Sequence, residues 1–191
     1  MKEKIISNKQ YFLYSDLSNE LKAIYYKKIY RYLLNLVFEY QGFNTWYNNL
    51  FFTGYDLCNN REIVLCEIDY KIAAVAILKN SSMEKKVCTF RVAKEYQHQG
   101  IGHELMERSF ELLKTDKPMI TLHKNKLSQF SKLLDYYNFS LEQTKKHYYN
   151  IFSTELVYNG VLPEKQSIFG SFEIIDMQNV YNNYVVLDKR E

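Results

Sequence analysis

The sequence predicts a mixed α/β domain with a mostly antiparallel central sheet and flanking helices. The first observation is that apolar residues recur at helical spacing over residues 17–40, before any clear strand. The second is a set of three short apolar runs between residues 63 and 92, two of them joined by a tight turn. The third is a strand, helix, strand order from residue 87 to residue 122, which requires at least one parallel crossover.

The composition predicts one folded core, and it leaves the partner to be identified from a site. The chain has 191 residues, of which 47% are hydrophobic and 16% aromatic. At this length, folding buries roughly 70% of the unfolded surface. Six Gly and two Pro exclude collagen-like and linker-dominated architectures. The 25 Lys and Arg against 22 Asp and Glu are too even to predict nucleic-acid binding from bulk charge.

The three cysteines, Cys58, Cys66 and Cys88, favour reduced and mostly buried thiols. They have neither C-x-x-C spacing nor a nearby histidine pair, so we expect no zinc site and no disulfide framework. No apolar segment follows Lys2 and Lys4, and no run of about 18 apolar residues occurs. We therefore expect a cytoplasmic protein without a membrane span and without a metal.

Two helices are predicted before the first clear strand. Residues 17–40 indicate one long helix that ends at Gln41 and Gly42, and a shorter one follows, capped by Asn44 or Thr45. The short helix carries four aromatic or apolar side chains and closes near Gly54. The apolar face of the long helix consists of Leu21, Ile24, Tyr25, Ile29, Leu33, Leu36, Val37 and Tyr40.

The strands and later helices follow in order. Residues 63–68 and 72–78 indicate an antiparallel hairpin, and residues 87–92 a third strand. A glycine turn then leads into a helix with Leu105, Met106, Phe110 and Leu113 on one face, and a strand at residues 119–122 follows Pro118. A further helix at residues 127–136 precedes alternating segments around Phe139 and at residues 148–158.

We place one domain at residues 1–159 and a C-terminal extension at residues 160–191. The extension carries many apolar and aromatic residues, so we expect it to be ordered. Its role cannot be derived from its sequence.

The segment with the clearest chemistry is residues 97–102, which read QHQGIG, between a strand and a helix. Successive backbone N–H groups and a helix N-terminus at such a corner point together at an anion such as a phosphate. Gly100 allows close approach of a pyrophosphate, and Gly102 permits tight entry into the helix. The segment lacks the third Gly of a dinucleotide motif and the Lys-Ser/Thr of a P-loop.

Together with its flanking segments, this loop resembles the acetyl-CoA-binding core of the GNAT N-acetyltransferase family. The family signature Gln/Arg-x-x-Gly-x-Gly/Ala is matched by Gln97, Gly100 and Gly102. The resemblance covers residues 61–149 and is strongest from Val87 to Leu113. It implies that the strand before the loop splays from a parallel neighbour at residues 119–122, with pantetheine in the opening.

The resemblance also implies the cofactor contacts. Main-chain groups of Phe90, Arg91 and Val92 would pair with pantetheine like an added strand. Lys94 and Lys124 are candidates for phosphate contacts by charge alone. The glycine loop would hold the pyrophosphate, and its candidate contacts are Gln97, His98, Gln99, Gly100, Ile101, Gly102 and His103.

The family pattern weakens after residue 125, where the general acid would lie. Phe139 falls on the family's Phe, but Leu134 stands where many members carry the Tyr that protonates the departing CoA thiolate. Leu127 stands where many carry Asn, and Asn138 where many carry Gly. Tyr136 is a poor substitute, because a shift of two helical residues rotates a side chain by about 200°.

The proton acceptor is the second open question. An alkyl amine has a pKa near 10.4, so only about one in 2,500 is neutral at pH 7 and able to attack a thioester. We predict His123 as base or acceptor contact, with a surface histidine as the alternative. Glu62, Glu67 and Asp69 on the first hairpin could also face the acceptor. His98 suits a phosphate-adjacent position better than catalysis.

Other reactive or aromatic residues have plainer interpretations. Cys88 could carry an acetyl group, but a buried, inert thiol is the default for a cysteine on an apolar strand. Trp46, Tyr47, Phe51 and Phe52 could line an acceptor pocket, and core packing is favoured over that role.

The sequence therefore predicts an N-acetyltransferase that moves an acetyl group from acetyl-CoA to a primary amine of unidentified class. The alternative is a degenerate GNAT-fold protein that binds CoA or a protein partner without catalysis, suggested by Leu134 and the absent strand carboxylate. An unrelated ligand or an RNA-associated role is a third interpretation. We expect no membrane partner and no nucleic acid, and a homodimer is compatible with this interpretation.

Overall fold

The computed structural model describes residues 8–40, 42–52, 54–149 and 153–164. Their strands form one sheet in the order β1-β2-β3-β4-β5-β7-β6, in which the β4–β5 pair is parallel and the other pairs are antiparallel. The bounds are β1 Lys9–Leu13, β2 Arg61–Ile68, β3 Lys71–Asn80, β4 Lys85–Val92, β5 Met119–His123, β6 Leu141–Lys146 and β7 Thr154–Tyr158. The predicted fold class is confirmed.

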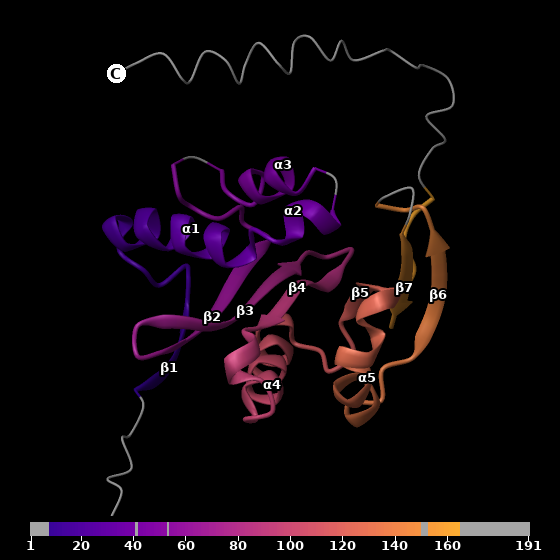
Figure 1. Ribbon diagram of the computed structural model, residues 1–191. Helices are drawn as coiled ribbons and strands as arrows, with labels where there is room; N and C mark the ends of the chain where they lie inside the picture. The colour runs from indigo at the N-terminus through magenta and orange to yellow at the C-terminus, as the bar shows by residue number, and fades with distance from the viewer. Residues whose placement is uncertain (1–7, 41, 53, 150–152, 165–191) are drawn as a thin grey trace, which may run out of the picture.

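Helices cover both faces of this sheet (Figure 1). One face carries α1 (Asn19–Leu33), α2 (Leu36–Glu39) and α3 (Phe43–Asn48), and the other carries α4 (Ile101–Leu113) and α5 (Leu127–Tyr136). Alternation along β2 feeds both layers: Ile63 and Leu65 pack toward α1, whereas Val64 and Cys66 pack toward α4. Each layer therefore has its own buried cluster against a shared sheet.

The predicted hairpin of β2 and β3 is confirmed, and its turn is one residue shorter than the predicted strand ends imply. Asp69 and Tyr70 both have positive φ, 49° and 64°. Two successive positive φ angles define the type I′ turn that matches strand twist in a hairpin. A two-residue turn therefore connects β2 with β3, and Tyr70 adopts in it a left-handed conformation that bulky residues rarely take.

The prediction of one helix over residues 17–40 is wrong, because the helix breaks between α1 and α2. Near the break, Val37 N–H donates to Leu34 O at 3.1 Å and Phe38 N–H donates to Asn35 O at 3.3 Å, which are tight turn bonds. Asn35 favours such local alternatives to the helix. The apolar stripe continues through the break, so periodicity could not reveal it.

Two further differences concern the N-terminal part. The cap of α3 is Gly42 with φ 83°, not Asn44 or Thr45, which lie inside the helix. Strand β1 was not predicted, because it is short and opens with two polar residues. It pairs along the outer edge of β2, from Lys9 opposite Ile68 to Leu13 opposite Val64.

The sheet opens between β4 and β5. Only Lys86 opposite Met119 and Val87 opposite Ile120 are paired, although both strands continue. On the other side of β4, Leu78 pairs with Val87 and Ile77 pairs with Thr89, so Cys88 forms a β-bulge. The bulge bends β4 where the parallel pairing ends, which gives the splayed pair that the resemblance implied.

The chain beyond β7 is described only as far as residue 164. Leu162 is buried against Met119 and Val157, so the first residues of the predicted extension pack on the sheet. The expectation of an ordered extension otherwise falls on residues 165–191, outside the described residues. No helix among the described residues has the length and apolar character needed to cross a membrane.

Candidate active site

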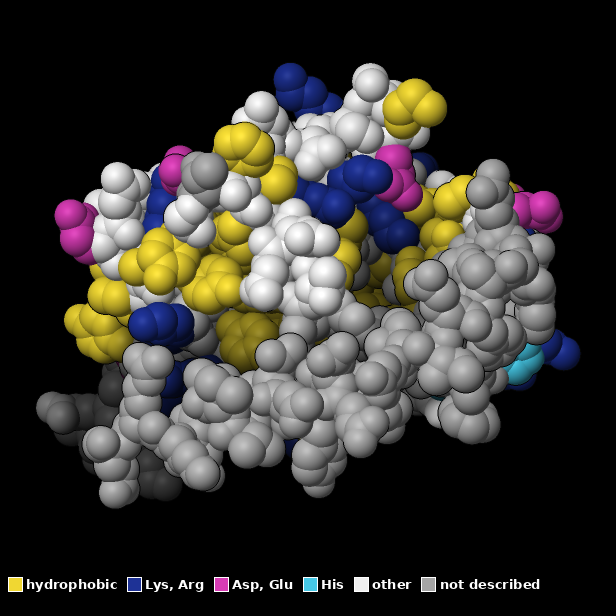
Figure 2. Space-filling model, turned by 90° about the horizontal axis from the view of Figure 1, so that it is seen from above, with side chains coloured by type: hydrophobic (Ala, Val, Ile, Leu, Met, Phe, Trp, Pro, Cys, Tyr) yellow, Lys and Arg dark blue, Asp and Glu magenta, His cyan; other side chains and the backbone are white. Residues whose placement is uncertain are grey.

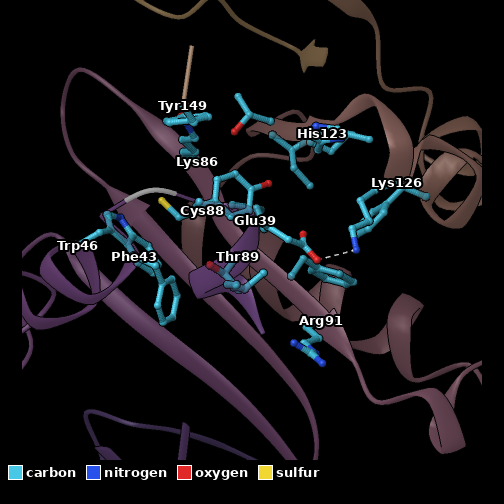
Figure 3. Close-up of a pocket in the computed structure, with 18 of the residues that line it drawn as sticks. Glu39, Phe43, Trp46, Lys86, Cys88, Thr89, Arg91, His123, Lys126 and Tyr149 are labelled. Carbon is cyan, nitrogen blue, oxygen red and sulfur yellow. Dashed lines mark hydrogen bonds and ion pairs between the residues drawn. The ribbon is translucent and has the colours of Figure 1, made fainter. Parts of the chain in front are cut away.

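A cavity of about 570 Å³ occupies the opening between β4 and β5. Its floor is β4 from Lys86 to Val92 and β5 from Ile120 to His123, and its walls come from α2, α3 and α5. Figure 3 shows side chains from these separate elements converging on the space. The cavity therefore lies where two neighbouring strands part, beyond the last paired residues of β4 and β5.

The glycine loop, residues 97–103, lies at the start of α4 beyond the end of β4. Gly100 has φ 82°, a left-handed conformation that favours glycine, and no side chain caps the helix N-terminus. A Cβ added at Gly100 would meet no heavy atom nearer than Glu104 Oε1 at 3.9 Å, and one added at Gly102 none nearer than Val92 Cγ2 at 3.9 Å. The space before these amides is therefore open, which fits an anion at a helix N-terminus.

Side chains of the loop brace it rather than fill that space. Gln97 Nε2 donates to Val92 O at 3.1 Å, and Gln99 Nε2 donates to Glu95 O at 2.9 Å. The His103 ring packs edge-on against Tyr136, with ring centroids 4.6 Å apart. The backbone amides are thus the groups that remain for a ligand.

The predicted cofactor residues fall into two sets. Phe90, Arg91, Val92 and Gln97 line the cavity. The other set does not line it and lies around the start of α4: His98, Gln99, Gly100, Ile101, Gly102 and His103. Of the two lysines proposed by charge, Lys94 lines the cavity and Lys124 does not.

His123 ends β5 and lines the cavity. The Asn125 backbone N–H donates to His123 Nδ1 at 3.1 Å, so a neutral ring carries its hydrogen on Nε2. In this arrangement His123 presents a donor to the cavity, and acting as a base would require it to exchange that tautomer. Its predicted role in catalysis stays a prediction.

The position aligned with the family's acid does not face the cavity. Leu134 is 2% exposed and packs in the core between the sheet and the α4–α5 layer. Leu134 is absent from the cavity wall, where α5 contributes Gln129 and Phe130. Tyr136 is 66% exposed and contacts His103 on α4, so it does not replace the acid.

Two tyrosines that the sequence analysis did not select line the cavity. Tyr40 follows α2 and Tyr149 follows β6, and their rings meet edge to face with centroids 5.8 Å apart. Burial raises the pKa of both phenols, so both are neutral donors at pH 7. The Tyr148-Tyr149 doublet was visible in the sequence, but nothing local placed it opposite α2.

The carboxylates considered as bases lie elsewhere. Ser15 Oγ donates to Glu62 at 2.6 Å, Lys28 Nζ donates to Glu67 at 2.6 Å, and the Asn8 N–H donates to Asp69 at 3.0 Å. None of these three lines the cavity. The carboxylates that do line it are Glu39, bridged to Lys126 at 2.8 Å (Figure 3), and Glu84, bridged to Lys79 at 2.6 Å.

Cys88 lies in the bulge, and burial raises the pKa of its thiol. Arg61 donates from Nη1 to its Sγ at 3.2 Å. Because the raised pKa favours the thiol over the nucleophilic thiolate, the inert interpretation is the better one. Of the early aromatic residues, Trp46 lines the cavity, Tyr47 and Phe51 are buried in the core, and Phe52 is 82% exposed.

Comparison with known proteins gives the family. Residues 37–151, more than half of the chain, match the profile of the acetyltransferase (GNAT) domain. No curated protein matches the sequence. Solved structures share the fold at low identity: the chain is similar to a Bacillus subtilis acetyltransferase in complex with CoA, at 14% identity and TM-score 0.54 over 81% of this chain and 100% of that one.

Two more structures define the range of similarity. The ribosomal-protein-S18-alanine N-acetyltransferase of Escherichia coli matches at 16% identity and TM-score 0.52, over 82% of this chain and 98% of that one. Nourseothricin acetyltransferase matches at 14% identity and TM-score 0.48, over 52% of this chain, which spans 64% of that protein's length. The profile match establishes that the chain belongs to the GNAT acetyltransferase family, and the splayed β4–β5 pair and the glycine loop of the structure agree with it.

Proposed function

We propose that the protein is an N-acetyltransferase that transfers an acetyl group from acetyl-CoA to a primary amine in the cytoplasm. The proposal depends on one observation: the cavity and the glycine loop both lie along β4. The cavity opens where β4 leaves β5, and the uncapped glycine loop follows the far end of the same strand. A long ligand with an anionic head and a reactive tail would suit both.

The residues present fit acetyl-CoA. Amides from Gln99 to His103 would hold the pyrophosphate, because they open onto free space at a helix N-terminus. Main-chain groups of residues 90–92 would hold pantetheine, because β5 leaves that edge of β4 unpaired. The relative from Bacillus subtilis is itself in complex with CoA, which supports this assignment. Acetyl-CoA would supply the activated acetyl thioester.

Two cavity groups could help the acceptor amine to lose its proton. Glu39 projects from α2 into the cavity and shares its charge with Lys126 at 2.8 Å. His123 lies across from it at the end of β5, with Nε2 as the nitrogen free of the Asn125 bond. The Glu39 carboxylate would attract the ammonium form of the acceptor. Its proton could pass, directly or through water, to Glu39 or to His123 in the tautomer that leaves Nε2 without a hydrogen.

Protonation of the CoA thiolate would fall to a tyrosine of the cavity. Tyr40 and Tyr149 are neutral donors that approach the space from outside the sheet. Most of the rate would come from positioning and from backbone amides near the bulge that stabilise the developing oxyanion, which together supply several kcal/mol.

The test is acetyl-CoA-dependent acetylation over a panel of amines, with CoA thiol release and product mass measured together. We expect at least one primary amine to gain one acetyl group in step with thiol release. The degenerate alternative is favoured if CoA raises the melting temperature and no amine is acetylated. An absence of both CoA binding and transfer would reject the proposal.

A further inference from the structure

Three cations form a row across the sheet at the end of the cavity farthest from the glycine loop. Arg61 on β2 pairs with Lys79 on β3, and Lys79 pairs with Lys86 on β4. Residues directly opposite on neighbouring strands point to the same face with Cβ atoms about 5 Å apart. All three side chains line the cavity. The view from above shows Lys and Arg side chains gathered beside an acidic one on this face (Figure 2).

The row carries more positive charge than its neighbours neutralise. Lys79 is paired, because its Nζ lies 2.6 Å from Glu84 Oε2. Arg61 donates one hydrogen bond to a thiol, from Nη1 to Cys88 Sγ at 3.2 Å. Lys86 is 8% exposed, and no described residue forms a hydrogen bond or ion pair with its ammonium. Arg61 and Lys86 therefore lie near Cys88, and neither forms an ion pair with a carboxylate of the described residues.

An unpartnered ammonium at this depth is costly for folding. Burial is the largest influence on the pKa of Lys86 and lowers it; Cys88 and Glu84 oppose this shift, and the charges of Lys79 and Arg61 add to it. The nearby Glu155 is fully buried on β7; burial raises its pKa, whereas the charges of His123 and Lys86 lower it. Within the described part of the structure, Glu155 and Lys86 do not form an ion pair. An apolar side chain at position 86 would destabilise the fold less than a buried lysine does, which favours a ligand-binding role for Lys86.

We propose that Arg61 and Lys86 bind an anionic group of the acceptor, so that the preferred acceptor is an amine that also carries a carboxylate or a phosphate. This inference rests on the proposed function and narrows its substrate class. The anion would complete the pairing that the protein leaves open, with Lys86 Nζ and the remaining Arg61 donors as hydrogen-bond partners. Figure 3 shows Lys86 beside Cys88 and Tyr149, apart from Arg91 and Lys126.

This site is separate from the glycine loop. Val92 lies six residues after Lys86 along β4, a distance of about 20 Å at about 3.3 Å per residue. A pyrophosphate on the loop therefore cannot reach Lys86 directly. The strands part just after Val87, so the reacting carbon would lie within about 10 Å of Lys86. The acceptor's amine and anion should accordingly be separated by a short chain.

The experiment compares amines that differ only in the anion. Pentylamine is paired with 5-aminovalerate, and ethanolamine with phosphoethanolamine, so that the two arms distinguish carboxylate from phosphate. Each pair is tested with the wild type, Lys86→Met, Lys86→Arg and the matched control Lys85→Met. Lys85 is the exposed neighbour on β4 and does not line the cavity, and its Nζ donates to Lys114 O at 3.4 Å.

We expect the wild type to acetylate at least one anionic amine with a kcat/KM about tenfold or more above that of its neutral partner, as a charged hydrogen bond provides. Lys86→Met should abolish the difference in kcat/KM between the two members of a pair, Lys86→Arg should restore part of that difference, and Lys85→Met should keep it. Equal use of both members of each pair by the wild type would overturn the anion site and leave the proposed function intact.

A binding measurement keeps the inference testable without turnover. Thermal melts of the CoA-saturated wild type should rise with the anionic member of a pair and not with the neutral one, and Lys86→Met should lose that rise. If neither anionic probe is preferred in transfer or in melting, the inference is wrong. Because Lys86→Met replaces a buried charge with an apolar chain, its melting temperature without ligand should equal or exceed that of the wild type.

Discussion

The glycine loop can be tested with two substitutions that have opposite effects on stability. Gly100 has φ 82°, so Gly100→Val forces a β-branched residue into a left-handed conformation. This should cost about 1–2 kcal/mol and lower the melting temperature by about 2–8 °C for a domain of this size. Gly102 lies in the first turn of α4, where Ala is better than Gly by about 1 kcal/mol. Gly102→Ala should therefore raise the melting temperature.

The two variants also separate CoA binding from stability. CoA at 100 times its dissociation constant should stabilise the wild type by about 2.7 kcal/mol, a rise of about 5–10 °C. Gly100→Val should lose this rise, because its side chain enters the open space before the amides. Gly102→Ala should keep most of it, because the family motif accepts Ala there. The assay is a thermal melt of each folded variant with and without CoA.

A full CoA shift in folded Gly100→Val would refute the reasoning, because it would place the pyrophosphate away from this loop. Loss of the shift in both variants would instead show that the space before α4 is tighter than the 3.9 Å clearances indicate.

Four further substitutions test the cavity. His123→Ala should lower transfer by about 10²-fold or more if the ring acts as base, and a loss below threefold would mark it as a surface contact. Tyr149→Phe should lower kcat more for a poor leaving thiol than for a good one if its phenol is the acid, which steady-state rates with two acyl-thioesters would reveal. Cys88→Ala should keep transfer within a few-fold, and loss of all turnover would revive the acetyl carrier. Leu134→Tyr should lower the unfolding free energy by about 1–3 kcal/mol from overpacking, and a gain in kcat would contradict the buried placement of Leu134.

The sequence predicted the parts of the fold that depend on local pattern. Residues 127–136 match α5 at both ends, and the hairpin of β2 and β3 turns within residues 69–71, between the predicted strands. The predictions failed where the apolar pattern of the sequence does not follow the secondary structure of the backbone. The break at Asn35 lies within a continuous apolar stripe, and β1 is too short and polar at its start to show alternation.

The site was predictable where one segment forms it and not where distant segments meet. The glycine loop is contiguous, so its residues could be proposed together. The catalytic end is built from α2, β4, β5 and the segment after β6, and each element contributes only one or two side chains. Tyr40 and Tyr149 are 109 positions apart and touch only after folding. The family pattern along α5 aligned Leu134 with the general acid, but the structure buries Leu134 in the core.

The row of cations shows why the proposed acceptor preference could not be predicted from the sequence. In the sequence, Arg61, Lys79 and Lys86 are ordinary basic residues near strand ends, where a solvated lysine is the usual interpretation. The strand register brings the three side chains together on one face, because a one-residue slip in either strand pair would turn a member of the row to the opposite face. The bulge at Cys88 shifts the alternation of β4 by one residue, because Lys86 lies opposite Lys79 and Thr89 lies opposite Ile77. Lys86, Thr89 and Arg91 therefore share one face of the sheet, so the irregularity at which the strands part also puts Lys86 on the same side as the cavity-lining residues beyond it.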